Sequence, residues 1–275
     1  MGQNWFDKAD ARLVWKHAAE IILTCKDYKF IPLHENAGEI INDNLIMHNG
    51  ILIHPLSYYG KNAVELFKIT KGVHEPQEER VFQEVLKVIP DKATMVEFGS
   101  YWSFYSIWFK SLIKNGKSFL VEANEKNLNY GKHNFKINGH EGDFTCARVC
   151  RTFVEGQCVS LDSFVKDKNI DFLDIFHADI DGSEMEMLIG GENTFNNNKV
   201  GFAFISTHFD LHEKCVELLK SYNYEILHSI SLTESYSFDG IIVAKSPLYD
   251  KNIPNVQLDK RISNQAIDPD QSINR

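Results

Sequence analysis

The chain has 275 residues and 43% of them are hydrophobic, so it can bury the core of one large α/β domain with an appendage, or of two small domains. Its net charge of −9 and pI of about 5.7 argue against a protein that binds nucleic acid, which would need a basic face. No apolar run reaches the roughly 18 residues of a membrane span, so we expect none.

The amino terminus, MGQNWFDKAD, has no basic segment followed by an apolar one, so no signal peptide is predicted. Phe6 stands where an N-myristoylation signal would carry Ser or Thr. The 5 cysteines are scattered, and Cys146-x3-Cys150 lacks the second pair of a zinc site. We therefore interpret all of them as reduced thiols of a cytoplasmic protein.

Residues 1–75 are predicted to form an N-terminal extension of helices and a hairpin. Apolar residues between Trp5 and Ile22 recur at near-helical spacing, which indicates a first helix. In DNLIMHNGILIHP, two short apolar runs flank Asn49-Gly50, the dipeptide that type I′ hairpin turns favour. The segment KNAVELFKITKG predicts a further helix that ends near Gly72.

Residues 76–247 alternate between strand and helix patterns, after a helix for which Pro76 suits the first turn. The candidate strands are TMVEF, SFLVEA, FTCARV, DIFHADI, VGFAFIST and DGIIVAK. The candidate helices between them are FYSIWFKSLIKN, EKNLNYGKHNFKIN, GSEMEMLIGGENTF and LHEKCVELLKSY. This alternation predicts an α/β fold, a mostly parallel sheet covered by helices on both faces, with an antiparallel pair of strands at the end. Residues 248–275 read as a polar C-terminal tail.

The first candidate site is the turn Glu97-Phe98-Gly99-Ser100, where a strand ends. Gly99 permits a tight turn, and the N–H groups that follow can receive an anion such as a carboxylate. A dinucleotide loop would need three glycines, which makes an NAD-dependent oxidoreductase a poor reading. Tyr101 and its aromatic neighbours suit a cationic ligand such as a sulfonium, or else simply pack in the core.

A second acid, Glu122, ends the next strand, where a carboxylate can accept hydrogen bonds from both hydroxyls of a ribose. The alternative is a surface acid that the dipole of the following helix favours.

The third candidate is HADIDGSEMEML, in which His177, Asp179 and Asp181 share one face of a strand. The histidine and aspartates could act in catalysis, or the two aspartates could hold a divalent ion. Asp181 could instead be an N-cap, His177 a satisfied core histidine, or the pattern a weak match to an iron triad.

His208 follows another apolar strand and opens a loop, where it could meet the residues of the third site. A histidine near its usual pKa can take a proton from a hydroxyl. His212 lies in the following helix and is interpreted as structural.

Taken in order, these segments resemble the FkbM family of S-adenosylmethionine-dependent methyltransferases over roughly residues 75–245. Residues 97–101 with Tyr105-Ser106 correspond to the family's acid-x-Gly turn and the aromatic-Ser pair after it. VEANEKNLNYGKHNFKING is similar to its Glu-Pro motif, SLDSF to its Leu-Asp segment, and DFLDIFHADIDGSEMEMLIGGENTF to its Lys-x-Asp-x-x-Gly-x-Glu segment. The chain departs from the pattern at four points: Ser103 replaces a glycine, Ala123 a proline, His177 a lysine, and Thr207-His208 a glutamate.

The resemblance implies a Rossmann-like class I methyltransferase fold with a seven-stranded sheet, and S-adenosylmethionine as cofactor. It implies that Gly99 admits the methionine carboxylate and that Ser100 and Tyr101 line it. It further implies that Glu75 touches the cofactor's amino group, that Glu122 binds the ribose and that Asp162 lies near the adenine. The implied cofactor residues are Glu75, Glu97, Gly99, Ser100, Tyr101, Ser106, Glu122, Ala123, Asn124 and Asp162.

The resemblance also suggests O-methylation of a sugar, a glycan or a natural product. For such a reaction our hypothesis from the residues themselves is that His177, Asp179 and His208 are the catalytic candidates. One of the histidines would remove the acceptor's proton and Asp179 would orient the base or the acceptor. A divalent metal such as Mg²⁺ stays an open alternative, and the acidic surface is compatible with a homodimer. The rival hypothesis is a non-catalytic binding or scaffold protein that retains the fold, because the chain departs from the family pattern at several positions.

Overall fold

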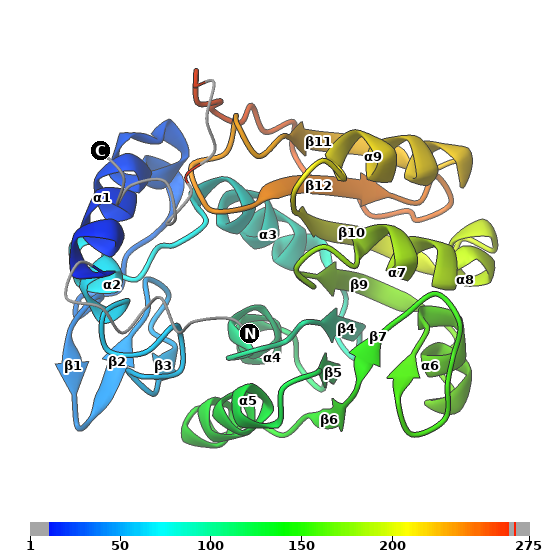
Figure 1. Cartoon of the computed structure of the whole chain (residues 1–275), viewed down its shortest axis with the longest axis horizontal. Helices are drawn as coiled ribbons and strands as arrows, with labels where there is room; N and C mark the ends of the chain where they lie inside the picture. Colours follow the sequence, from blue (N-terminus) through cyan, green and yellow to red (C-terminus); the bar gives the residue numbers. More distant parts are fainter. Residues whose placement is uncertain (1–10, 264–266, 268–275) are drawn as a thin grey trace.

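A seven-stranded sheet forms the centre of the computed structural model, which describes residues 11–263 and residue 267 (Figure 1). The strand order is β11-β12-β10-β9-β4-β5-β6, and β12 alone runs antiparallel to the others. The strands are β4 (Thr94–Phe98), β5 (Lys117–Glu122), β6 (Asp143–Cys146), β9 (Leu173–Ala178), β10 (Val200–Thr207), β11 (Glu225–Ile230) and β12 (Gly240–Lys245). The predicted mostly parallel α/β sheet is confirmed. Strand β11, which carries polar residues along its length, was not among the strands located from the sequence.

Helices cover both faces of this sheet, as predicted. One face carries α3 (Pro76–Val88), α4 (Phe104–Leu112) and α5 (Glu125–Ile137), and the other carries α6 (Leu161–Asp167), α7 (Glu184–Gly190), α8 (Glu192–Asn196) and α9 (His212–Ser221). Successive strand residues point to opposite faces, so Ile175 of β9 belongs to one apolar core and Phe176 to the other. Both side chains are fully buried. The sheet is therefore fixed between two separate cores.

The N-terminal elements pack beside the α3 and α4 face of the sheet. They are α1 (Ala11–Thr24), the 3-10 helix η2 (Lys26–Phe30), β1 (Ile40–Ile41), β2 (Asn44–Ile46), β3 (Leu52–Ile53) and α2 (Val64–Thr70). The predicted hairpin is confirmed, because Leu45 pairs with Ile53 and Gly50 adopts a φ of 85° in the turn between them. The start of the first predicted helix, with Trp5 and Phe6, lies outside the described residues.

Two segments differ from the sequence-based expectations. Residues 148–159 form the short parallel pair β7 (Arg148–Val149) and β8 (Cys158–Val159), and a disulfide joins Cys150 to Cys158 across a Cα–Cα distance of 5.9 Å. The interpretation of every cysteine as a reduced thiol is thus wrong for this pair, which the local fold brings within bonding distance. Helix α6 was not predicted, although Ser160 and Ser163 form a reciprocal capping box at its start.

The described part of the C-terminal tail runs over the surface without helix or strand, and Asp259 ties it to η2. In the described part of the chain, no helix has the length and apolar character needed to span a membrane.

Candidate active site

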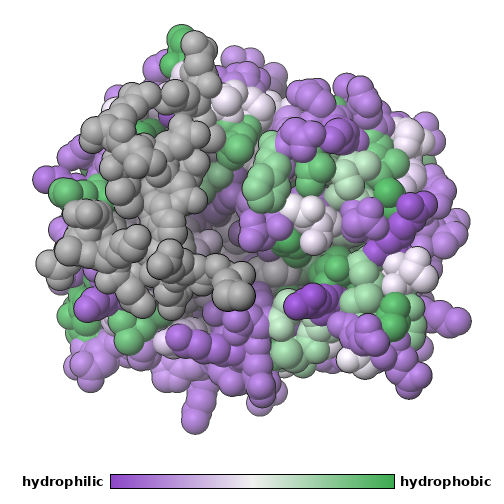
Figure 2. All heavy atoms as spheres, viewed as in Figure 1, coloured by the Kyte–Doolittle hydropathy of each residue, from purple (hydrophilic) through white to green (hydrophobic). Residues whose placement is uncertain are grey.

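A cavity of about 770 Å³ lies beyond the carboxyl ends of β4, β5, β9 and β10. Figure 2 shows a recess near the middle of the side of the molecule that faces the viewer. Strand order reverses between β4 and β9, the point where open α/β sheets bind ligands. The volume of the cavity is in the range of sites that bind small molecules. The predicted site residues that line it are Glu75, Glu97, Gly99, Ser100, Tyr101, Glu122, Ala123, His177, Asp179 and His208.

The turn at Gly99 packs closely against the backbone of Asp179. Gly99 has a φ of 75°, and a Cβ at this position would overlap the carbonyl oxygen of Asp179. The N–H groups of Gly99 and Ser100 donate to the carbonyl of Val121 at 2.8 and 3.0 Å. Both N–H groups are therefore already paired within the protein. The sequence had led us to expect that the backbone of this turn would bind a carboxylate of the ligand.

Two buried polar atoms beside this turn lack hydrogen-bond partners among the described residues. They are Oε2 of Glu97 and Oγ of Ser100, on side chains that are 3% and 2% exposed in residue terms. Burial raises the pKa of Glu97 to about 7. Ser106 donates hydrogen bonds to the carboxyl of Glu97, and Oε2 of Glu97 and Oγ of Ser100 have the capacity to bind a ligand as well.

Glu122 ends β5 and lies against the same turn. Its Oε2 accepts a hydrogen bond from the N–H of Tyr101 at 3.1 Å, and its Oε1 accepts one from the N–H of Asn124 at 2.7 Å. Each carboxylate oxygen retains a free lone pair, and the residue lines the cavity. The side chain is thus held in place with capacity for two further donors.

Glu75 forms a buried network with its neighbours at the start of α3. Its Oε2 accepts a hydrogen bond from the hydroxyl of Tyr105 at 2.6 Å and lies 3.2 Å from Nε2 of His74. Burial opposes both charges, but the mutual attraction lowers the pKa of Glu75 to about 2 and raises the pKa of His74 to about 10. Glu75 therefore stays ionised as one half of a buried ion pair with His74 on this side of the cavity.

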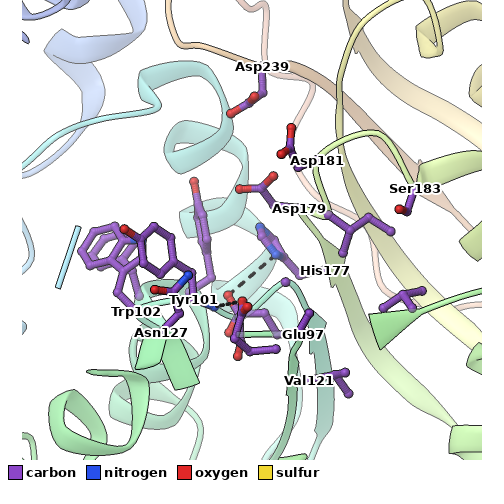
Figure 3. A pocket seen from close by; sticks show the side chains of 18 of the residues that line it. Glu97, Tyr101, Trp102, Val121, Asn127, His177, Asp179, Asp181, Ser183 and Asp239 are labelled. Atoms are coloured by element: carbon purple, nitrogen blue, oxygen red, sulfur yellow. Dashed lines mark hydrogen bonds and ion pairs between the residues drawn. The ribbon is translucent and has the colours of Figure 1, made fainter. Parts of the chain in front are cut away.

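His177 points from β9 into the cavity (Figure 3), and its two ring nitrogens differ. Nε2 lies 2.8 Å from Oε1 of Glu78, a buried residue of α3. Nδ1 has no hydrogen-bond partner among the described residues and lies 3.8 Å from Oε1 of Glu97. Burial lowers the pKa of His177, so its imidazole is neutral, and its Nδ1 is buried on the side of Glu97.

His208 lies among three carboxylates. Its Nδ1 is 2.7 Å from Oε1 of Glu184, and its Nε2 is 2.8 Å from Oδ1 of Asp239 and 3.6 Å from Oδ1 of Asp179. Burial works against the charged ring, yet the hydrogen bonds to Asp239 and Glu184 raise the pKa of His208 to about 11. Burial and the neighbouring Asp239 raise the pKa of Asp179. The expected meeting of Asp179 and His208 is therefore present.

Aromatic rings close the side of the cavity next to the N-terminal elements. They come from Tyr58, Tyr59, Tyr101, Trp102, Phe104, Tyr105 and Phe238. The hydroxyl of Tyr101 accepts a hydrogen bond from the N–H of Tyr59 at 2.8 Å, which joins the N-terminal elements to the turn after β4. Rings with polar tips can surround a cationic centre and exclude water from it.

Three predicted cofactor residues do not line the cavity. Asp162, expected near the adenine, accepts hydrogen bonds from the N–H groups of Asn193 and Thr194 at the start of α8. Asn124 caps α5 through its side chain, and Ser106 is buried in α4. Local capping and core packing account for these positions.

His212 is structural, as predicted, because its ring bridges the hydroxyls of Thr207 and Ser229.

Two residues that the sequence did not single out belong to the site. Asp239 precedes the antiparallel strand β12, whose start lies at the edge where the parallel strands end. Glu78 reaches His177 across 99 positions of sequence, and no local motif indicates that contact.

The strand order with one antiparallel strand next to the edge, and the cavity at its switch point, define a Rossmann-like class I methyltransferase fold. Residues 149–226, from β7 into β11, match the family profile described as the methyltransferase FkbM domain. This match confirms the resemblance to the FkbM family of S-adenosylmethionine-dependent methyltransferases.

Solved structures with a similar fold include a precorrin-6y C5,15-methyltransferase from Geobacter metallireducens, with 18% identity, 61% of this chain and 89% of that chain covered, and a TM-score of 0.45. Another is TrmK of M. capricolum in complex with S-adenosyl-homocysteine, with 17% identity, coverage of 64% and 71%, and a TM-score of 0.44. No curated protein matches the sequence. The assignment of the fold rests on the strand order of this chain.

Proposed function

We propose that this protein transfers the methyl group of S-adenosylmethionine to a hydroxyl of a sugar, a glycan or a natural product. The observation that carries the proposal is the cavity at the switch point, where buried polar atoms without partners lie beside a neutral histidine. The match to a methyltransferase domain supports the reaction class.

The residues present fit this cofactor. The ammonium and carboxylate of its methionine end would satisfy Oε2 of Glu97 and Oγ of Ser100, which are buried without partners. Glu122 has the remaining lone pairs to accept from two ribose hydroxyls. The aromatic rings and the acidic lining favour a ligand with a positive sulfur.

When bound, S-adenosylmethionine supplies a methyl group on a sulfonium. The chain contributes mainly positioning, which can be worth roughly 7–11 kcal/mol in favourable cases. A hydroxyl acceptor must also lose a proton, and we assign this step to the imidazole of His177, whose pKa burial lowers. His208 is less suited as a base, because both of its nitrogens have acidic partners and its pKa is raised to about 11.

The test combines binding and transfer. We expect calorimetric titration with S-adenosylhomocysteine to show micromolar binding, and methyl-labelled S-adenosylmethionine to label hydroxyl compounds rather than matched amines. His177→Gln should keep the binding and lose most of the transfer. Binding without transfer to any acceptor would favour the non-catalytic scaffold, and absence of binding would overturn the proposal.

A further inference from the structure

Topology brings three side chains together at the end of the cavity next to β10 and β12. Asp179 directly follows β9, His208 directly follows β10, and Asp239 directly precedes β12. Strand β12 is antiparallel to β10 and Thr207 pairs with Gly240, so His208 and Asp239 are neighbours just beyond the last pair of the ladder. We call these three residues the Asp–His–Asp cluster.

The geometry of the cluster suits a metal ion. One ligand atom from each residue lies within 4.8 Å of the other two. Nε2 of His208 faces both carboxylates, at 2.8 Å from Asp239 and 3.6 Å from Asp179. Figure 3 shows Asp179 and Asp239 at the same end of the cavity. All three residues are partly exposed to the cavity, which leaves room for a further ligand of the ion.

The second ring nitrogen of His208, Nδ1, contacts a carboxylate on the side away from the cluster. Nδ1 of His208 lies 2.7 Å from Oε1 of Glu184, whose side chain is fully buried and which also accepts a hydrogen bond from the N–H of Gly182 at 3.0 Å. A carboxylate behind a ligating histidine fixes the ring and raises its basicity. Glu184, a residue outside the cluster, therefore directs Nε2 toward Asp239 and Asp179, and an ion bound there would displace the proton that Nε2 shares with Asp239.

A second observation points to a ligand beside the cluster. Nδ1 of His177 has no hydrogen-bond partner among the described residues, although the side chain is only 3% exposed. His177 lies two residues before Asp179 and lines the same cavity (Figure 3). This nitrogen lies 3.8 Å from Oε1 of Glu97, so a polar group bound in the cavity could complete it.

The charge of the cavity favours a cation there. Its described lining residues include six acids, which are Glu75, Glu97, Glu122, Asp179, Asp181 and Asp239. They outnumber the three positive groups, which are Arg148 and the two histidines with a raised pKa, His74 and His208. Like charges this close repel one another in a partly dry site. A divalent ion at the end with Asp179 and Asp239 would offset the excess.

We propose that the Asp–His–Asp cluster binds one divalent transition-metal ion, with Glu184 positioning His208. One imidazole and two carboxylates favour Mn²⁺ or Fe²⁺ over Mg²⁺, which prefers oxygen ligands alone. Asp181, expected from the sequence to share an ion with Asp179, lies outside the cluster. The ion would supply Lewis-acid polarisation of the acceptor's hydroxyl. That role deepens the proposed function and rests on it, whereas the binding of the ion does not.

Binding is tested with the full chain, treated with chelator and titrated with Mn²⁺, by measuring free Mn²⁺ with electron paramagnetic resonance. We expect a single site that Mg²⁺ at equal concentration displaces only weakly. Asp239→Asn and Glu184→Gln should each weaken Mn²⁺ binding by at least about 10-fold. Asp181→Asn is the matched control: it removes a nearby carboxylate that is not one of the three ligands and should weaken Mn²⁺ binding by less than about 3-fold, and asparagine tolerates the φ of 47° at this position.

Titration of each variant with S-adenosylhomocysteine separates this proposal from the proposed function. Retained binding of that ligand by Asp239→Asn shows that the variant is folded, so its loss of Mn²⁺ supports the site. A wild-type protein that binds S-adenosylhomocysteine but not Mn²⁺ would overturn the ion site and leave the function standing. Binding of Mn²⁺ without S-adenosylhomocysteine would support the ion site and contradict the cofactor. Equal losses in Asp181→Asn and Asp239→Asn would overturn the assignment of the ligands.

Discussion

Oε1 of Glu78 lies 2.8 Å from Nε2 of His177, and both side chains are almost completely buried. The next residue of α3, Glu79, contacts different histidines, with Oε1 at 2.6 Å from Nδ1 of His74 and Oε2 at 3.5 Å from Nε2 of His48. Adjacent helix residues point in different directions, so Glu78 contacts a histidine of the sheet, whereas Glu79 contacts histidines that precede α3 in the chain. The two have opposite pKa shifts.

This difference predicts opposite effects of removing the two charges. Burial and the charge of Glu75 raise the pKa of Glu78, so folding takes up a proton above about pH 4.5 and Glu78 costs stability as pH rises. We expect Glu78→Gln to raise the free energy of unfolding at pH 8 relative to wild type, and the gain to shrink by up to about 1.4 kcal/mol per pH unit as pH falls. Urea unfolding at pH 5.5, 7 and 8 measures it.

Glu79→Gln is the control one residue away. Burial alone would raise the pKa of Glu79, but the neighbouring His48 and His74 lower it, so its charge stabilises the fold above about pH 4.5. The variant should lose about 1–3 kcal/mol at pH 7, because the hydrogen bonds from His74 and the N–H of Glu75 lose a charged acceptor. Losses of the same sign in both variants at pH 8 would contradict this account.

The turn at Gly99 predicts a substitution with a severe effect on the fold. In Gly99→Ala, the added Cβ would overlap the backbone carbonyl of Asp179, which cannot move without displacing the end of β9. We expect a loss of more than about 3 kcal/mol in unfolding free energy, with S-adenosylhomocysteine binding lost as well. Gly139→Ala has nearly the same φ, 73°, but its Cβ meets nothing within 4 Å, so only the backbone cost of about 1–2 kcal/mol should appear. Comparable losses in the two variants would show that the overlap is not the cause.

Glu122 and Asp162 were both expected to contact the cofactor, and the structure predicts that they behave differently. Glu122→Gln removes a charged acceptor from the cavity and should weaken S-adenosylhomocysteine binding by roughly 10- to 100-fold. Asp162→Asn weakens a cap of α8 and should lower the unfolding free energy by about 1 kcal/mol without changing that affinity. Calorimetry measures the S-adenosylhomocysteine affinity of both variants, and thermal unfolding measures their stability. A weaker affinity in Asp162→Asn would show that Asp162 does contribute to cofactor binding.

Most of the sheet could be predicted because local patterns determine its strands. The predicted strand at residues 200–207 has the same limits as β10, whose residues are all buried, and an unbroken apolar pattern is typical of such a strand. Strand β11 was missed because it lies at the edge of the sheet and carries Glu225, His228 and Ser229, which weaken the pattern. The disulfide between Cys150 and Cys158 could not be predicted, since it depends on how residues 148–159 fold back.

The site was predictable only where strands carry side chains to the switch point in chain order. Gly99, Glu122, His177 and Asp179 lie at strand ends that the sequence identifies, and all line the cavity. Asp239 precedes its strand, so recognising it needs the direction of β12 as well as its location. Contacts over long sequence separations, such as that of Glu78, leave no local signal.

The last prediction concerns His228, which lies on the edge strand β11 opposite Val243 of β12. Burial lowers its pKa from 6.5 to about 4. Between these values the unfolded chain holds more protons at this residue than the folded protein does, so the free energy of unfolding rises with pH across this window. The contribution of His228 to stability is lost as pH falls through the same window. His228→Gln removes this proton uptake. Wild type should therefore lose stability faster than the variant between about pH 6.5 and pH 4, by up to about 1.4 kcal/mol per pH unit, and the two curves should run parallel above pH 7.5. The other buried histidines contribute to both proteins and cancel in the difference, because distant sites are nearly additive. Denaturant unfolding at half-unit steps of pH measures both curves, and parallel curves below pH 6.5 would show that His228 gains its proton as readily in the folded protein as in the unfolded chain.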